Sequence, residues 1–270
     1  MRTRFGPLKL IVLLIALFLV FPALFLIPLS LSSGTTFEFP PKGWSLRWYE
    51  NLVTDPGWLD AIVVSLKVAL GATVLAVIIG TCATFALFRF SPRVRALGTT
   101  TLISPLVIPN ILIALAMYTT FLRMDLAGTL TGLILANTCL AIPYVIIAVS
   151  TRLHGYKKSL TSAALSLGAT PFATFRSVTF PLILPGVMAG ALFAFVVAFD
   201  ELVIALLLQG RDTKTLSVKM FSSVIEVTDP TISAASTVLV VVVSVVILTI
   251  QLGWISGSRR RTTSRGAVGA

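Results

Sequence analysis

The chain has 270 residues, of which 56% are hydrophobic and only 11% are charged, and its mean hydropathy is +0.99. A soluble domain carries about a quarter charged residues, so this composition indicates a membrane protein. The net charge of +11 does not indicate nucleic-acid binding, because the basic residues are dispersed between apolar runs of bilayer length. The sequence contains no P-loop motif, and its single histidine, His154, has no metal-ligand spacing around it. Cys82 and Cys139 lie inside apolar runs, where we expect two small buried residues and no disulfide.

The N-terminal part of the chain predicts one transmembrane helix followed by an external segment. The first apolar run, residues 8–31, is too long for a signal peptide and has no small-residue cleavage pattern, so we interpret residues 1–32 as a retained span. Residues 33–58 are polar and rich in tryptophan, with Trp44 and Trp48 among them, which is typical of a segment lying along the membrane surface.

Residues 59–256 are predicted to form the core, and its first three apolar runs are residues 59–88, 97–122 and 129–149. Lys67 in the first of them either extends its amine to the membrane surface or pairs with a carboxylate. Pro105 and Pro109 break residues 97–122, the third apolar run of the chain, near its middle. Backbone groups freed by proline are tolerated in a membrane only beside a cavity or against protein, so this break either lines a path or is a structural kink.

A polar segment, residues 157–181, separates the fourth apolar run from the fifth. Its pattern predicts a short helix with a narrow apolar stripe, capped at Ser159, Thr161 or Ser162. Gly168 is expected to end that helix, and Pro171 to begin a second one whose inner side includes Phe172. Pro181 and Pro185 are expected to end the second helix and to start the next span.

The fifth apolar run, residues 182–208, contains the acidic pair Asp200–Glu201. Carboxylates inside a span are costly against lipid, so they are expected to face a cavity or a protein partner. A polar segment with a short helix near residues 216–225 follows, then a sixth run at 232–255 and a basic tail at 257–270. The sequence therefore predicts an all-α polytopic membrane protein with six transmembrane helices.

The distribution of charge predicts the orientation of these helices. With the N-terminus inside, the internal segments hold most of the 21 Lys and Arg residues, whereas the acidic residues fall outside except for the pair in the fifth run. The positive-inside rule therefore places both termini in the cytoplasm.

Residues 157–181 resemble the cytoplasmic coupling loop of the permease subunits of ABC importers. The family signature is Glu-Ala-Ala, three residues, a Gly, and later Leu-Pro or Phe-Pro; Ala163–Ala164, Gly168 and Phe180–Pro181 occupy these places. Ser162 stands where the Glu is expected, which removes a charge that the family uses to dock its ATPase. Residues 48–249 resemble spermidine/putrescine-type permeases, which have a similar acidic pair before a hydrophobic run and a glycine, here Gly210.

The resemblance implies a type I importer permease with the coupling loop between helices 4 and 5. Such a chain forms half of the path for a small cationic amine, such as spermidine or putrescine, in the bacterial inner membrane; related permeases take 4-aminobutyrate, opines, ferric iron or organophosphonates. Its implied partners are a second homologous permease in a heterodimer, two ATPase subunits and a periplasmic binding protein. The chain itself is then no enzyme and binds no cofactor, since ATP and magnesium belong to the ATPase subunits.

The resemblance also assigns roles to residues. Coupling to the ATPase is expected at Leu160, Ser162, Ala163, Ala164, Leu167, Gly168, Ala169 and Phe172. The translocation path is expected at Pro109, Asn110, Asn137, Tyr144, Asp200 and Glu201. For the acidic pair a structural network between subunits, or a pair with Lys67, remains the alternative.

Two other classes of membrane protein remain open from the residues alone. A secondary transporter or channel needs an ion relay and inverted repeats. The sequence offers only the acidic pair as a candidate for a relay, and no duplicated segment is evident in it. A structural subunit of an unrelated complex needs neither the broken third run nor the loop at 157–181.

Overall fold

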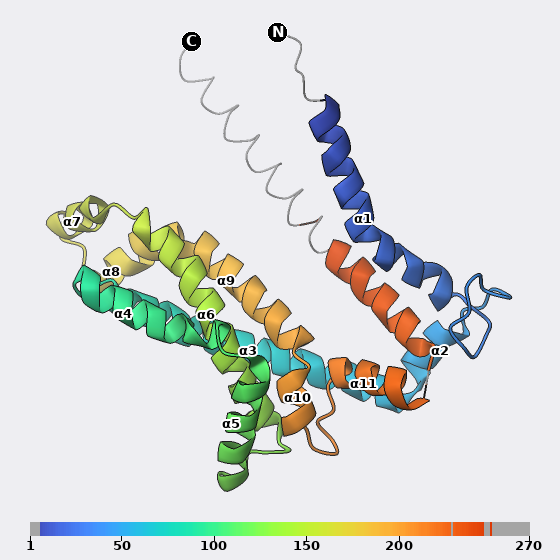
Figure 1. Ribbon diagram of the computed structural model, residues 1–270. Helices are drawn as coiled ribbons and strands as arrows, with labels where there is room; N and C mark the ends of the chain where they lie inside the picture. Colours follow the sequence, from blue (N-terminus) through green and yellow to red (C-terminus); the bar gives the residue numbers. More distant parts are fainter. Residues whose placement is uncertain (1–5, 228, 246–248, 250–270) are drawn as a thin grey trace. The chain divides into compact units, whose positions relative to one another are not determined.

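The computed structural model describes residues 6–227, 229–245 and 249, and these residues form helices, turns and loops without strand ladders (Figure 1). The all-α prediction is confirmed. The chain divides into two compact units, the first formed by Met1–Leu59 with Ser222–Ala270 and the second by Asp60–Phe221.

The first unit begins with α1 (Gly6–Ser30), which matches the first predicted span and holds Pro22 and Pro28 within it. A short amphipathic helix, α2 (Arg47–Thr54), is tied to the end of α1 by a 2.7 Å hydrogen bond between the hydroxyls of Ser30 and Tyr49. On its other side, the amide of Asn51 donates to the hydroxyl of Thr231, 2.8 Å away, at the start of a helix over Thr231–Val245. The π-helix η3 (Ser223–Val227) also belongs to this unit.

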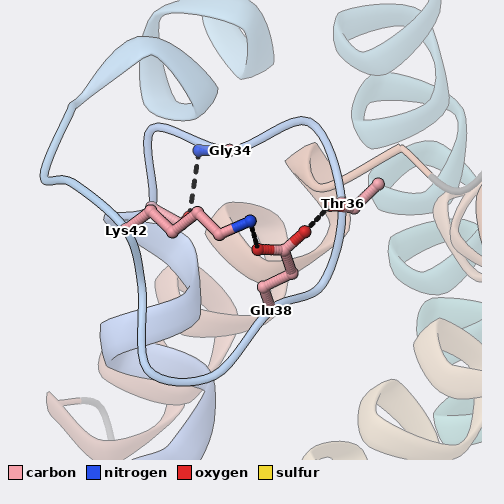
Figure 2. A network of polar contacts seen from close by, with 5 residues as sticks. Gly34, Thr36, Glu38 and Lys42 are labelled. Carbon is pink, nitrogen blue, oxygen red and sulfur yellow. Dashed lines mark hydrogen bonds and ion pairs between the residues drawn. The ribbon is translucent and has the colours of Figure 1, made fainter.

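The loop between α1 and α2 is closed by its own polar contacts (Figure 2). Lys42 forms an ion pair of 2.5 Å with Glu38, which also accepts a hydrogen bond from Thr36 at 3.1 Å. The hydrogen bond from Lys42, then that from Thr36, lowers the pKa of the Glu38 carboxyl. The ring of Phe39 packs on Phe25 of α1 at a centroid distance of 4.3 Å. This packing of the loop beside an apolar helix agrees with a position at the membrane surface.

The second unit holds the helices that position the candidate site. In chain order these are α3 (Pro56–Leu87, which begins in the first unit), α4 (Pro92–Ile103), η1 (Ser104–Leu106), α5 (Asn110–Arg123), α6 (Leu130–His154), α7 (Lys158–Ser166), α8 (Pro171–Thr174), η2 (Phe175–Thr179), α9 (Phe180–Asp200), α10 (Val203–Leu208) and α11 (Leu216–Ser222).

The two larger apolar clusters among the described residues of the second unit hold its helices together. One joins α3, α6 and α9, which Figure 1 shows packed together, through Ala76, Ala141, Val145, Val149, Leu153, Ile183, Val187 and Ala194. The other joins α5, α6 and α10 and is formed mainly by Ala114, Leu133, Ala136, Leu140, Ile204, Ala205 and Leu208. Small residues are frequent in both, as expected where membrane helices approach closely.

Within the described residues, four helices are long and apolar enough to cross a membrane: Lys9–Ser30, Pro56–Leu87, Leu130–His154 and Pro171–Asp200. A fifth span results if Pro92–Leu106 and Asn110–Arg123, which are bent by 92° at their break, are counted as one. Of the predicted sixth run, the structure describes the helix Thr231–Val245 and residue 249; the remaining residues of the run, and the basic tail, lie outside the described residues.

The structure corrects three details of the sequence interpretation. The fifth run is not one helix, because α9 ends at Asp200 and α10 begins at Val203. Pro181 and Pro185 do not end a helix: α8, η2 and α9 are continuous, since the N–H of Phe180 bonds to the carbonyl of Phe175 in a wide π turn just before Pro181. Cys82 and Cys139 are free but exposed, because both lie on helix faces turned away from the packed interior.

Candidate functional site

The segment between α6 and α9 forms the predicted helix, glycine turn and second helix. α7 ends in a Schellman motif, in which the N–H of Ala169 bonds to the carbonyl of Ala164 at 3.1 Å and the N–H of Gly168 to that of Leu165 at 3.0 Å. Gly168 has a φ of +85°, a conformation that glycine adopts without strain. Thr170 caps α8 by accepting a hydrogen bond from the N–H of Ala173 at 3.2 Å, with Pro171 in the first turn. Both the stop at Gly168 and the start at Pro171 are confirmed.

Two details of this segment differ from the sequence interpretation. α7 begins earlier than expected, because its N-cap position is Lys157 and not one of Ser159, Thr161 and Ser162, which lie within the helix. Phe172 does not line an inner side, because its side chain is 73% exposed. It projects from the short α8 while Thr174 on the same turn is buried.

The segment presents an apolar surface outward. Leu160, Leu167 and Phe172 are 45%, 88% and 73% exposed, and Leu165, which the sequence reasoning missed, is 44% exposed. Among the other residues expected to act in coupling, Ser162, Ala163 and Gly168 are exposed and Ala164 and Ala169 are half-buried. An exposed group of large apolar side chains beside basic residues is typical of a protein-binding surface.

The acidic pair lies at the break between α9 and α10, and its two carboxylates have different environments. Glu201 is 8% exposed, and its carboxylate accepts hydrogen bonds from the N–H groups of Ile204 at 2.9 and 3.0 Å and of Ala205 at 3.1 Å. The side chain therefore caps α10 and satisfies donors that a helix start otherwise leaves free.

Asp200 is exposed, and the described residues give its carboxylate no hydrogen bond or ion pair. Lys67 is also exposed and, within the described chain, pairs with neither carboxylate. Asp200 is therefore the carboxylate of the pair that is available to a solute or to another chain.

The break in the third run places Pro109 and Asn110 at the start of α5, and both are exposed. Beside them is an apolar hollow of about 380 Å³ between the break, α5 and α6, lined by Pro105, Ile108, Leu112, Ile113, Ala116, Met117, Thr120, Phe121 and Cys139. The exposed break agrees with a backbone that lines a cavity or meets another chain.

Asn137 and Tyr144 lie on α6, away from that hollow. Asn137 is 2% exposed, and its amide donates to the carbonyl of Leu133 at 2.9 Å; its own oxygen has no partner among the described residues. Tyr144 is half-buried. Asn137 is thus bonded to Leu133, which belongs to the apolar cluster that joins α5, α6 and α10. Asn110 and Asp200 remain the exposed polar residues among those expected to line the translocation path.

The loop that follows α5 and the loop that follows α10 are joined by polar contacts that the sequence did not reveal. The N–H of Gly128 donates to the carbonyl of Leu208 at 2.9 Å, and the hydroxyl of Thr213 accepts from the N–H of Gly210 at 2.7 Å and donates to the carbonyl of Gly128 at 3.2 Å. A Cβ at Gly210 would lie 2.4 Å from the oxygen of Gly128. This close approach explains why a glycine follows the hydrophobic run.

Comparison with known proteins relates most of the chain to transport permeases. The chain is 34% identical over 250 residues to the putrescine transport system permease protein PotI of Escherichia coli, covering 89% of this chain and 88% of PotI. It is 28% identical over 211 residues to the spermidine/putrescine transport system permease protein PotC of Haemophilus influenzae, covering 78% and 82% of the two chains. The crystal structure of a bacterial ABC transporter that imports the polysaccharide alginate contains a chain with the same fold, with a TM-score of 0.71, 16% identity, and 94% and 98% coverage.

A family model also matches residues 72–261, which include α6, the glycine turn, α9 and α10. The prediction of an ABC importer permease is therefore confirmed, and the secondary transporter and the unrelated structural subunit are excluded. The chain belongs to the family of binding-protein-dependent transport system inner membrane components.

Proposed function

We propose that this chain forms half of the translocation path of an ATP-driven importer for a polyamine such as putrescine or spermidine. The observation that carries the proposal is the 34% identity to a putrescine permease along nearly the whole of both chains. The exposed carboxylate of Asp200 at the break in the fifth run supports it, since a carboxylate attracts a protonated amine.

The proposed assembly contains a second homologous permease, two ATPase subunits and an external binding protein. The segment Lys157–Thr179 is the docking surface for an ATPase subunit, with Leu160, Leu167 and Phe172 as the apolar side chains that enter its groove. Ser162 lacks the charge of the family's Glu, so docking rests on these apolar contacts. ATP and magnesium bind to the ATPase subunits, since this sequence has no P-loop.

The proposed path runs along the two broken spans. Asp200 and Asn110 are its polar residues, because both are exposed at breaks in the helices. Glu201 instead caps α10 and so stabilises the break between α9 and α10. Both termini lie in the cytoplasm in this proposal, because that orientation puts the basic residues on the inner side.

A second candidate substrate is an anion. The chain is 30% identical over 221 residues to the molybdenum transport system permease protein ModB of Mycobacterium bovis, covering 76% of this chain. A carboxylate in the path repels an anion, so Asp200 favours the polyamine.

A thermal-shift screen of the binding protein that copurifies with the complex tests the proposal. Stabilisation by putrescine or spermidine, and not by molybdate, 4-aminobutyrate, an opine, ferric iron or an organophosphonate, is the expected result. Stabilisation by one of the other solutes alone would contradict the polyamine assignment.

A further inference from the structure

Tyr156 lies just after α6, where the chain enters the segment that carries α7 and α8. Its ring packs against the cluster that joins α3, α6 and α9, and its backbone N–H bonds to the carbonyl of Leu153 at 3.2 Å. The ring is therefore anchored on the membrane helices.

The hydroxyl of Tyr156 joins the two arms of the loop. It shares one hydrogen bond with the hydroxyl of Thr161, which is in α7, and a second of 3.1 Å with the hydroxyl of Thr179, which ends η2. Thr161 precedes the turn at Gly168 and Thr179 follows it, and Thr179 is only 8% exposed. One phenol thus connects α7 to the entry of α9 and to the core that contains α6.

We infer that Tyr156 is the positioning residue that transmits a displacement of α7 to α6 and α9. The inference rests on the proposed function, because it requires that α7 be displaced by an ATPase subunit. α7 itself presents exposed apolar side chains to that subunit, so on its inner side it needs a directional attachment to the membrane helices. The two hydrogen bonds of Tyr156, whose ring is fixed in the core, supply this directional attachment, because a hydrogen bond resists both sliding and rotation.

The test is Tyr156→Phe in the complete importer, reconstituted in proteoliposomes with its binding protein. Phenylalanine keeps the ring packing and loses both hydrogen bonds. We expect the complex to assemble with an unchanged melting temperature and an unchanged basal ATPase rate. The number of solute molecules imported per ATP hydrolysed is expected to fall by about fivefold or more, the lower end of typical coupling between linked sites.

Thr161→Val is expected to give the same loss of coupling, and the double variant is expected to be no worse than Tyr156→Phe, because both changes remove one shared contact. Two matched controls should keep the wild-type ratio. One is Tyr118→Phe, at a half-buried tyrosine of α5. The other is Thr151→Val, whose hydroxyl, among the described residues, bonds only to the carbonyl of Ile147 in its own helix at 2.8 Å.

A wild-type ratio of import to hydrolysis in Tyr156→Phe overturns the inference, and so does a lower melting temperature with that ratio unchanged. Failure of the wild-type complex to import any solute is a different result, since it overturns the proposed function on which the inference rests.

Discussion

Each carboxylate oxygen of Glu201 accepts a hydrogen bond from the backbone N–H of Ile204, at 3.0 and 2.9 Å. The contact makes Glu201 the cap of α10 and leaves Asp200, its exposed neighbour, as the carboxylate free to meet a solute. The two members of the acidic pair therefore have separate roles, and single substitutions distinguish them.

Glu201→Ala is expected to reduce assembly and stability, because the loss of a capping side chain costs about 1–2 kcal/mol. Glu201→Gln keeps one acceptor oxygen, so its stability is expected to lie between that of Glu201→Ala and that of the wild type. The yield and melting temperature of the purified complex measure this order. Equal stability of all three proteins would contradict the capping role.

Asp200→Asn is expected to assemble normally and to lower uptake by about tenfold or more, since a hydrogen bond to a charged group contributes about 1.5–3 kcal/mol. Uptake measured against solute concentration, with ATPase activity followed in the same vesicles, checks this. Lys67→Met is the matched control, because Lys67 pairs with neither carboxylate in the described chain. Normal uptake by Asp200→Asn would remove Asp200 from the path.

Gly168→Val is expected to uncouple the importer. A Cβ at Gly168 meets no atom within 4 Å, so the whole effect comes from the backbone, whose φ of +85° costs about 1–2 kcal/mol for a residue with a side chain. Gly168→Asn is the control, because asparagine tolerates this conformation and should retain transport. Equal transport by both variants would show that the turn geometry does not matter for coupling.

Gly210→Ala is expected to lower the melting temperature, because its Cβ would lie 2.4 Å from the carbonyl oxygen of Gly128 and overpacking costs about 1–3 kcal/mol. Gly155→Ala is the control, since its Cβ would lie 3.8 Å from its nearest neighbour, the carbonyl oxygen of Arg152. Similar melting temperatures for the two variants would contradict the close approach of the two loops.

The orientation can be tested with two exposed positions. In a background carrying Cys82→Ala and Cys139→Ala, Leu167→Cys and Trp44→Cys each provide one thiol at a site that is 88% or 69% exposed in the native chain. In cells that express the permease without the ATPase subunits that would cover position 167, a membrane-impermeant maleimide is expected to label position 44 in intact cells and position 167 only after permeabilisation. Labelling of position 167 in intact cells would reverse the topology.

The sequence predicted the features that depend on local chemistry. Gly168 and Pro171 have strong conformational preferences of their own, so the turn and the second helix were evident from the residues. The break at Pro109 was likewise expected, but the size of the bend, 92°, was not; α5 beyond the break packs against α10, which is distant in the sequence.

Features made by contacts between distant residues could not be predicted. Glu201 lies in an apolar run that has the composition of one continuous span, so its capping role emerges only from the break after Asp200. The contacts of Tyr156 with Thr179 and of Thr213 with Gly128 join residues far apart in the chain and leave no sequence pattern.

Import of labelled putrescine by the reconstituted complex tests the central claim most directly. Vesicles that contain this chain, its partner permease, the two ATPase subunits and the binding protein should accumulate putrescine when ATP is present on the ATPase side. Accumulation should be competed by spermidine but not by molybdate, and it should disappear when this chain is omitted. Accumulation that persists without this chain, or ATP-driven import of molybdate in place of putrescine, would contradict the account.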